Sequence, residues 1–439
     1  IVFFSASYAN GITTELLGLD LSANMWIWWV ILYAAFIALN AAGAKISFTF
    51  AIVVSIISIA IILVFSAMAI FSGAFSWDKL WDIVPDAGQS TFLPHGAFPI
   101  LFALPFAMWF FLGIEELPLA ARGLIGDGFT AALVAVDGAV DWLCLPRFDS
   151  PTVFARLLDW QRGGQMAMRP TQRPFEALQA YDPDTAVLET LFEVPNDGTL
   201  RLVDSMPWSD DPRACIHELH RRMDCLGGEA EVEIIFDPRF DYARDTPRIE
   251  IGEHGVMAEG SGGERLALST SQRLDWKPMP NGGLRATVQL RSGSPLWCIL
   301  NWNASVIEAV EAHRPYEHLR VTRRKWREWS SRLTYDGPWR HHVMRSAITL
   351  KLLMYGPTGA TVAAPTTSLP EWIGGTRNWD YRYTWVRDAA LTLRAANLIG
   401  YPQEARDFYH FIRDAVDADH GLELMYTLDG GAVPDESEL

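Results

Sequence analysis

The sequence predicts a protein of mixed fold class, with transmembrane helices first, an antiparallel β-sandwich next, and helices at the end. Three observations predict this order. Long apolar runs fill the chain before residue 122, short β-type runs separated by turn residues follow, and helical periodicity begins near residue 313. The net charge is −16, but the charged residues are unevenly distributed along the chain. Lys45 and Lys79 are the only bases among the first 121 of 439 residues. Acids outnumber bases in the remainder, so nucleic acid is not an expected partner.

Residues 1–121 contain three stretches long enough to cross a bilayer, which needs about 20 apolar residues. They are residues 25–43, 46–71 and 97–114. Lys45 lies in the tight connection between the first two stretches. Because basic residues favour the cytoplasmic side of a membrane, this connection is expected to be cytoplasmic. The third span would then run inward and place the rest of the chain in the cytoplasm. We therefore predict a multi-pass membrane protein with the lipid bilayer as a partner. The alternative is three buried helices of a large core.

The third stretch continues as FALPFAMWFFLGIEELPLAA, in which Pro105, Gly113 and Pro118 interrupt a helix. Irregular backbone at membrane depth is tolerated where it lines a cavity. The stretch resembles the sixth span of permeases of the amino acid, polyamine and organocation superfamily, and its sequence is similar to that of ethanolamine permeases. The resemblance implies a substrate site lined by Trp109 and by Phe111 to Gly113, with Glu115 in gating or ion coupling. Alternatively, the interruptions only end the helix and the glutamate is solvated.

Residues 122–312 are expected to form a β-sandwich, because many short apolar runs alternate with turn residues. Asp137-Gly138 stands between two such runs and predicts a hairpin with a two-residue type I′ turn. Further strands are expected at residues 187–194, 200–206, 232–236, 284–290 and 296–302.

Helical periodicity then takes over. Residues 313–335 form an expected linker helix, with its helical part at 316–333, where Trp326 and Trp329 share one face and a run of bases occupies the other. A nucleic-acid patch is the less favoured interpretation of those bases, since a solvated face explains them. Three more helices are expected at residues 339–353, 384–399 and 403–416.

The segment TRNWDYRYTWVRDAALTLRAANLIGY carries the richest chemistry. Tyr381, Tyr383 and Trp385 offer aromatic faces that suit a sugar ring, while Arg387 and Asp388 can hydrogen-bond to vicinal hydroxyls. The residues alone leave a second interpretation equally open, in which Arg387 and Asp388 are a structural ion pair at a helix N-terminus.

Together with IGDGFTAALVAVDGAVDWLCLPRFDSP and APTTSLPEWIGGTRNWDYRYTWVRDA, this segment resembles glycoside hydrolase family 15, which includes glucoamylases and trehalases. The resemblance implies a β-sandwich ahead of an (α/α)6 barrel, of which residues 336–439 would be the incomplete first part. It implies inverting hydrolysis of an α-glucoside or trehalose-like sugar without a cofactor. Tyr381 would steady the oxocarbenium charge, Trp385 would border the first subsite, and Arg387 with Asp388 would grip the terminal glucose.

The family's two catalytic glutamates are expected beyond Leu439, so the chain alone is predicted to be inactive. No metal is inferred, because the four cysteines show no CxxC pair and no zinc-type histidine pattern. Leu350, Leu352 and Leu353 are expected to lack neighbours, which would leave the β-sandwich as the one compact unit. Three interpretations stay open: a hydrolase with an adventitious permease piece, a transporter with adventitious hydrolase sequence, or a true membrane-tethered sugar protein.

Overall fold

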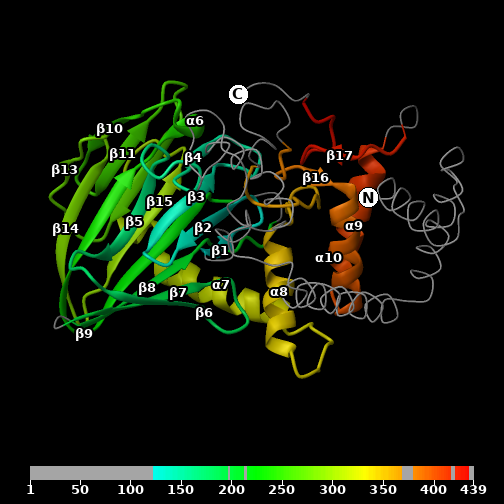
Figure 1. Ribbon diagram of the computed structural model, residues 1–439, viewed down its shortest axis with the longest axis horizontal. Helices are drawn as coiled ribbons and strands as arrows, with labels where there is room; N and C mark the ends of the chain where they lie inside the picture. The colour runs from blue at the N-terminus through cyan, green and yellow to red at the C-terminus, as the bar shows by residue number, and fades with distance from the viewer. Residues whose placement is uncertain (1–121, 196–197, 212–214, 368–378, 417–420, 435–439) are drawn as a thin grey trace, which may run out of the picture. The chain divides into compact units, whose positions relative to one another are not determined.

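The structure is a computed structural model that describes residues 122–195, 198–211, 215–367, 379–416 and 421–434 (Figure 1). These residues all belong to the compact unit Pro105–Leu439. They form a β-sheet domain followed by a helical region. Every strand pair in the β-sheet domain is antiparallel, as the short β-type runs predicted.

The strands of the β-sheet domain fall into two groups that share the long strand β9 (Glu218–Asp237). The first group contains β1 (Arg122–Gly126), β2 (Ala131–Ala135), β3 (Ala139–Cys144), β4 (Thr152–Phe154), β5 (Gln165–Pro170), β13 (Lys277–Pro278) and β14 (Leu284–Arg291). The second contains β6 (Glu176–Tyr181), β7 (Leu188–Val194), β8 (Gly198–Ser205), β10 (Arg248–Ile251), β11 (Gly255–Glu259), β12 (Arg265–Thr270) and β15 (Leu296–Trp302).

Strand β9 joins the two groups because its two ends have different neighbours (Figure 1). The end that begins at Glu218 pairs with β15, and the end that finishes at Asp237 pairs with β5 and β14. Gly227 and Gly228 lie between them, where β8 meets β9 with a shift in register. Glycine in a strand interior commonly marks such a bend. The apolar faces of the two groups meet in one core, which includes Phe192, Met223 and Phe236.

The expected hairpin is found at β2 and β3, but its turn differs from the prediction. Val136, Asp137 and Gly138 connect the strands, and Gly138 alone among them has a positive φ, at 80°. The Asp137 carboxylate accepts a hydrogen bond from the Ala139 amide at 3.2 Å. The loop therefore has three residues rather than the two of a type I′ turn, which needs positive φ at both positions.

The strands β2 and β3 are buried along their whole length, because each face packs against a different partner. Successive side chains of a strand point to opposite sides. Val134 and Val140 enter the core between the strand groups. Leu133 and Trp142 point the other way, into a second core that they share with the helices. The ribbon of β1, β2 and β3 is thus an internal layer.

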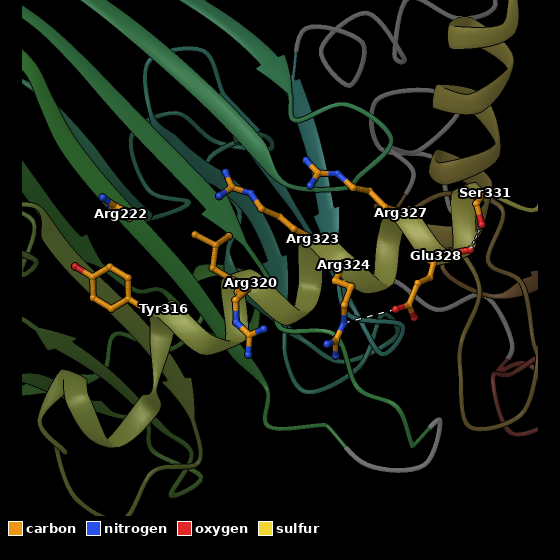
Figure 2. A pocket seen from close by; sticks show the side chains of 9 residues that line it. Arg222, Tyr316, Arg320, Arg323, Arg324, Arg327, Glu328 and Ser331 are labelled. Carbon is orange, nitrogen blue, oxygen red and sulfur yellow. Dashed lines mark hydrogen bonds and ion pairs between the residues drawn. The ribbon is translucent and has the colours of Figure 1, made fainter.

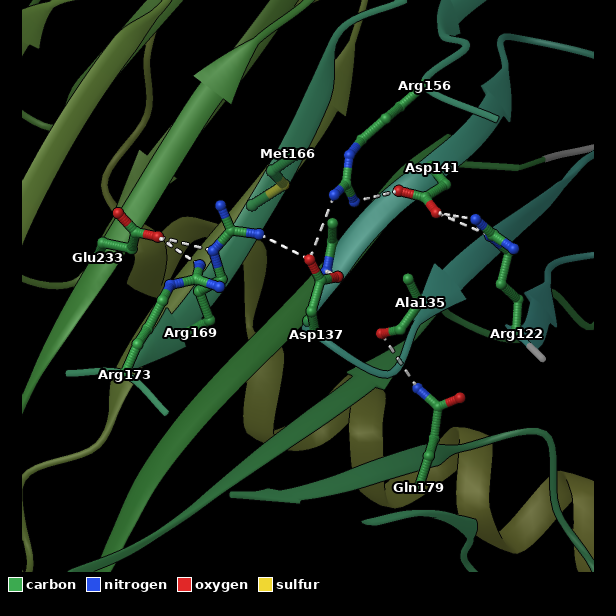
Figure 3. Close-up of polar contacts among 12 residues, drawn as sticks. Arg122, Ala135, Asp137, Asp141, Arg156, Met166, Arg169, Arg173, Gln179 and Glu233 are labelled. Atoms are coloured by element: carbon green, nitrogen blue, oxygen red, sulfur yellow. Dashed lines mark hydrogen bonds and ion pairs between the residues drawn. The ribbon is translucent and has the colours of Figure 1, made fainter. Parts of the chain in front are cut away.

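A chain of alternating charges crosses the first strand group (Figure 3). Asp141, with no exposed side-chain surface, is held by Arg122 and Arg156, each at 2.7 Å. Asp137 continues the chain with Arg156 at 3.3 Å and Arg169 at 2.7 Å. These pairs satisfy charges that burial would otherwise penalise heavily.

The helical region contains α7 (Pro315–Ser330), α8 (Arg340–Leu352), α9 (Val386–Leu398) and α10 (Pro402–Ala415), with the short strands β16 (Thr384–Trp385) and β17 (Met425–Tyr426). Two short elements precede it, α6 (Phe240–Ala243) and the 3-10 helix η3 (Val310–His313). The four expected helices are confirmed within one or two residues at most ends. Trp329 of α7 stacks on Tyr401 with ring centroids 4.0 Å apart.

Two expectations about the fold are wrong. Leu352 does have neighbours: it is only 1% exposed and lies in the core shared by β1, β3 and the helices, so the β-sheet domain is not packed by itself. The fold class that began with transmembrane helices is also corrected, because no helix of the described ranges has the length and apolar character to cross a membrane. The structure shows instead a β-sheet domain followed by a helical region. The predicted spans at 25–43, 46–71 and 97–114 lie outside the described residues.

Candidate functional site

The start of α9 positions the residues expected to bind sugar. Thr384 and Trp385 pair with Tyr426 and Met425, and the Val386 amide donates a hydrogen bond to the Leu424 carbonyl at 3.2 Å. The chain then turns into the first turn of α9, where Arg387 and Asp388 follow directly. The carboxylate of Asp388 at this end is favoured by the positive N-terminus of the helix dipole.

Three aromatic rings gather at this point. The ring of Trp385 lies 5.8 Å from that of Trp379 and 5.6 Å from that of Tyr381, centroid to centroid. Trp385 is 7% exposed, and its indole nitrogen donates to the Asp380 carbonyl at 3.3 Å. Two of the three expected rings, those of Tyr381 and Trp385, therefore lie next to each other, and Trp379 is a third neighbour. Tyr383 is half-buried, and burial raises the pKa of its hydroxyl.

Arg387 and Asp388 form an ion pair with each other at 3.0 Å. Their side chains are 67% and 40% exposed, so the pair faces water rather than the core. The Arg387 guanidinium also lies 5.8 Å from the centre of the Trp385 ring. An exposed pair contributes little to stability. The Arg387 guanidinium and the Asp388 carboxylate could therefore leave this ion pair and bind a ligand at little cost in stability.

Arg382 is the residue of this segment that the sequence analysis missed. It is 5% exposed, and its guanidinium makes two-point contact with the Asp380 carboxylate, the shortest bond being 2.7 Å. It also donates to the Ser150 carbonyl at 2.8 Å and to the Tyr242 hydroxyl at 2.6 Å. Burial opposes its charge, but Asp380 and its other partners hold the pKa of Arg382 above its ordinary value. Arg382 thus connects the segment that precedes α9 to the β-sheet domain.

Arg147 makes a second connection of this kind. Its guanidinium pairs with Asp149 at 2.9 Å and with Asp429 at 2.8 Å, and it lies 5.2 Å from the centre of the Tyr355 ring. Asp429 follows β17, which pairs with the strand that carries Trp385. Burial would lower the pKa of Arg147, but the two carboxylates raise it. The charge is therefore retained where the β3–β4 loop meets the segment after β17.

A separate groove of about 660 Å³ runs along α7 (Figure 2). Several arginines that line the groove already form ion pairs. Arg323 pairs with Asp182 and Glu189, each at 2.8 Å, and Arg327 pairs with Asp182 at 2.9 Å. Figure 2 shows Arg323 and Arg327 on one side of α7 and Arg320 on the other. Tyr316 is the one aromatic side chain among the residues that line the groove, whereas the segment before α9 places Trp379, Tyr381 and Trp385 together. We do not assign it to sugar binding.

A buried Ser, His and Glu arrangement also has no catalytic role. His313 Nδ1 lies 2.7 Å from Glu218 Oε1, and Ser269 Oγ lies 3.4 Å from His313 Nε2. Ser269 is fully buried and donates its proton to the Glu308 carbonyl at 2.7 Å. A nucleophile must be reached by its substrate. This cluster instead ties β9 and β12 to η3.

Two protein-family models match parts of this chain. Residues 107–303 match the family described as Trehalase-like, N-terminal, and residues 337–438 match Glycosyl hydrolases family 15. Residues 107–303 are therefore similar to a trehalase-like N-terminal domain, and residues 337–438 are similar to family 15 glycoside hydrolases. These matches show no fusion to a permease.

Trehalases are the relatives that the chain resembles. It is 37% identical to a trehalase of Thermoplasma volcanium over 70% of this chain and 49% of that protein, and 37% identical to one of Thermoplasma acidophilum over 68% and 51%. A trehalase of Mycolicibacterium smegmatis is 35% identical over 73% of this chain and 51% of its own length. The chain spans about half the length of the curated relatives it matches.

The transporter-site candidates Trp109, Phe111, Gly113 and Glu115 lie outside the described residues. All four fall inside the range 107–303 that matches the trehalase-like family. The predicted multi-pass membrane location is corrected together with the fold class. None of the helices in the part that the structure describes is able to span a bilayer, and the matched relatives are trehalases.

Proposed function

We propose that this chain is the N-terminal portion of a trehalase-like, inverting α-glycoside hydrolase, and that the start of α9 binds the terminal glucose of a trehalose-like sugar. One observation carries the proposal. In the region matched to family 15, the ring pair Tyr381 and Trp385 adjoins an exposed ion pair, Arg387 and Asp388. The matched relatives are trehalases, and this supports a trehalose-like sugar as the ligand. No cofactor or metal has a part in this binding step.

The chemistry of each residue supports this assignment. An aromatic face packs against the C–H face of a pyranose, and a charged guanidinium or carboxylate forms stronger hydrogen bonds to hydroxyls than neutral groups do. Arg387 and Asp388 each give up only one exposed ion pair when they turn to vicinal hydroxyls. The Tyr381 ring is tilted by 39° against that of Trp385. Its electron-rich face could stabilise positive charge that develops on the sugar.

Hydrolysis with inversion needs two further carboxyl groups, held about 6.5–9.5 Å apart on opposite sides of the scissile bond. The described carboxylates at residues 379–388 already have other partners or roles. Asp380 is locked to buried Arg382, and Asp388 is assigned to the sugar hydroxyls. We therefore infer that the 439-residue chain by itself binds the sugar without cleaving it. The permease interpretation is not carried into this proposal, because nothing in the described residues supports it.

Calorimetric titration of the chain with trehalose tests the binding step, with maltose as a second α-glucoside and cellobiose as a β-linked control. We expect trehalose to bind and cellobiose not to bind. Asp388→Asn and Arg387→Gln should each weaken trehalose binding by about 10-fold to 100-fold, since a hydrogen bond to a charged group contributes about 1.5–3 kcal/mol.

The chain offers a matched control in the second Arg-Asp dipeptide, Arg413 and Asp414 of α10. These side chains pair at 2.7 Å and are 56% and 66% exposed, much like Arg387 and Asp388. Asp414→Asn should leave trehalose binding unchanged. Equal effects of Asp388→Asn and Asp414→Asn would overturn the site. Glucose release from trehalose that disappears in Asp388→Ala would instead refute the inferred lack of turnover and keep the site.

A further inference from the structure

Asp127, Cys215 and His217 come together although they are far apart in the chain. Asp127 lies in the β1–β2 loop, and the other two precede β9. One ligand atom of each, a carboxylate oxygen, the sulfur and a ring nitrogen, lies within 4.8 Å of the other two. The Cys215 thiol donates to Asp127 Oδ2 at 2.9 Å. These are three different donor types around one point.

The surroundings aim these atoms at one another. Asp127 Oδ1 accepts the amides of Phe129 at 2.8 Å and Thr130 at 3.0 Å, so the loop holds the carboxylate with its second oxygen toward the sulfur. The His217 amide donates to Cys215 Sγ at 3.2 Å. The ring of His217 packs edge-on against Phe129 with centroids 5.5 Å apart. Amide donors and packed rings of this kind orient metal ligands in proteins.

One atom of this cluster is left without a partner. His217 Nδ1 is shielded from solvent and has no hydrogen-bond partner among the described residues. Buried polar atoms are rarely unpaired, and an ion is one of the standard explanations.

We propose that Asp127, Cys215 and His217 bind one borderline-soft divalent cation, with Zn²⁺ as the representative ion. A thiolate and an imidazole favour zinc over magnesium or calcium, which prefer oxygen ligands alone. Three protein ligands leave one tetrahedral position for water. The cation takes the place of the thiol proton, which passes to solvent, so the thiolate and the carboxylate together balance the charge of the ion.

The location assigns the ion a structural role. The Phe129 ring lies 5.8 Å from the Tyr355 ring, and the Gly356 amide donates to the Gly128 carbonyl at 2.7 Å. The β1–β2 loop is therefore a contact between the β-sheet domain and the segment after α8. A bound cation would link this loop to the segment that leads into β9. Its removal should lower thermal stability without a direct effect on the sugar-site residues.

The test uses the purified chain after chelator treatment, titrated with CoCl2 as a spectroscopic probe and with ZnCl2 in competition. We expect one Co²⁺ per chain, a thiolate-to-cobalt charge-transfer band, displacement by Zn²⁺ and proton release on binding. Cys215→Ser should remove the band and weaken binding by about 100-fold or more, since even indirect changes around a metal cost about 10–100-fold.

Two further variants keep the test decisive if Cys215→Ser is poorly folded. Asp127→Asn retains the side-chain oxygen that accepts the Phe129 and Thr130 amides, and so preserves the loop while it removes a ligand charge. Cys225→Ser changes another thiol near the middle of β9 and should leave the band intact. The absence of a stoichiometric Co²⁺ site would overturn the proposal. Wild-type binding in both Cys215→Ser and Asp127→Asn would do the same.

Discussion

The Arg382 guanidinium donates a hydrogen bond to the Tyr242 hydroxyl at 2.6 Å and so connects the segment that precedes α9 to the β-sheet domain. Tyr242 adopts a left-handed backbone conformation, with φ of 55°, and its amide bonds to Thr152 Oγ1 at 3.2 Å. The pKa of the Tyr242 hydroxyl is raised to about 12 by burial, so it stays protonated at neutral pH. The contact makes Arg382 a structural counterpart to Arg387, five residues further on.

The first prediction separates those two arginines. Arg382→Met should destabilise the chain by about 3–5 kcal/mol, because removal of one partner leaves the other charge of a buried pair uncompensated. Arg387→Met removes an exposed pair and should cost less than about 1 kcal/mol. Urea-unfolding midpoints measure both. For sugar binding, Arg387→Met should be impaired even though its fold is intact. Equal unfolding midpoints for the two variants would contradict the buried role of Arg382.

A second prediction concerns pH. Burial alone would raise the pKa of Glu218, but hydrogen bonds from His220 and His313 lower it to about 2 from 4.5. Burial lowers the pKa of His220 below 6.5, against the opposing effect of Glu218. In both cases the unfolded chain binds protons before the folded chain does, so stability falls on acidification, first below about pH 6.5 and further below about pH 4.5.

Urea unfolding of wild type and Glu218→Gln across this pH range checks the prediction. The variant should lose the dependence that belongs to the carboxylate, below about pH 4.5. Glu229→Gln is the matched control, because Glu229 is on the same strand and pairs with Arg291 at 2.8 Å but is 54% exposed. A wild-type stability that rises as the pH falls from 7 would show that the sign is wrong.

The third prediction tests the β2–β3 turn. A Cβ atom on Gly138 would stand 2.2 Å from the Met168 carbonyl oxygen, which belongs to the backbone of β5 and cannot move aside. Gly138→Ala should therefore cost more than the roughly 1–2 kcal/mol of the left-handed conformation alone. Gly263→Ala is the control, since Gly263 has φ of 86° and nothing within 4 Å of the added atom. Equal losses in thermal unfolding would mean that the clash is relieved at no cost.

A fourth prediction addresses the contact between α7 and Tyr401, the residue directly before α10. The rings of Trp329 and Tyr401 are 4.0 Å apart and inclined by only 8°. A double-mutant cycle with Trp329→Leu and Tyr401→Leu should give a coupling free energy of about 0.5–1.5 kcal/mol. The same cycle with Tyr409→Leu, a tyrosine of α10 that is 66% exposed, should give none. Additive losses for Trp329 and Tyr401 would show that the stacking adds nothing to their separate burial.

Local sequence patterns predicted the strands and helices well because those patterns depend on near neighbours. The runs at residues 284–290 and 296–302 became β14 and β15, and the helix expected at 403–416 became α10. β9 was harder: the expected strand covered only residues 232–236, whereas β9 has 20 residues. Its first part has a polar pattern and its middle contains two glycines, so its membership in both strand groups depends on distant partners.

The site residues show the same limit. Tyr381, Trp385, Arg387 and Asp388 were predicted from local chemistry together with the family resemblance, and the structure brings the two rings and the ion pair together. Their role in binding stays a prediction. Arg382 was missed because its partner in the β3–β4 loop is 232 residues away, and only its spacing from Asp380 offered a signal. The cluster of Asp127 and Cys215 spans 88 residues and carries no local motif.

The two-sided burial of β2 and β3 limits how this protein can be divided. A fragment that stopped before α7 would uncover Leu133 and Trp142, which are 2% and 0% exposed in the intact structure. Trp142 would also lose the Pro365 carbonyl that accepts its indole proton at 2.8 Å. Such a fragment would expose an apolar face of the sheet to water and would tend to self-associate. Truncation of the chain before α7 would therefore yield an aggregation-prone fragment rather than an independently folded domain.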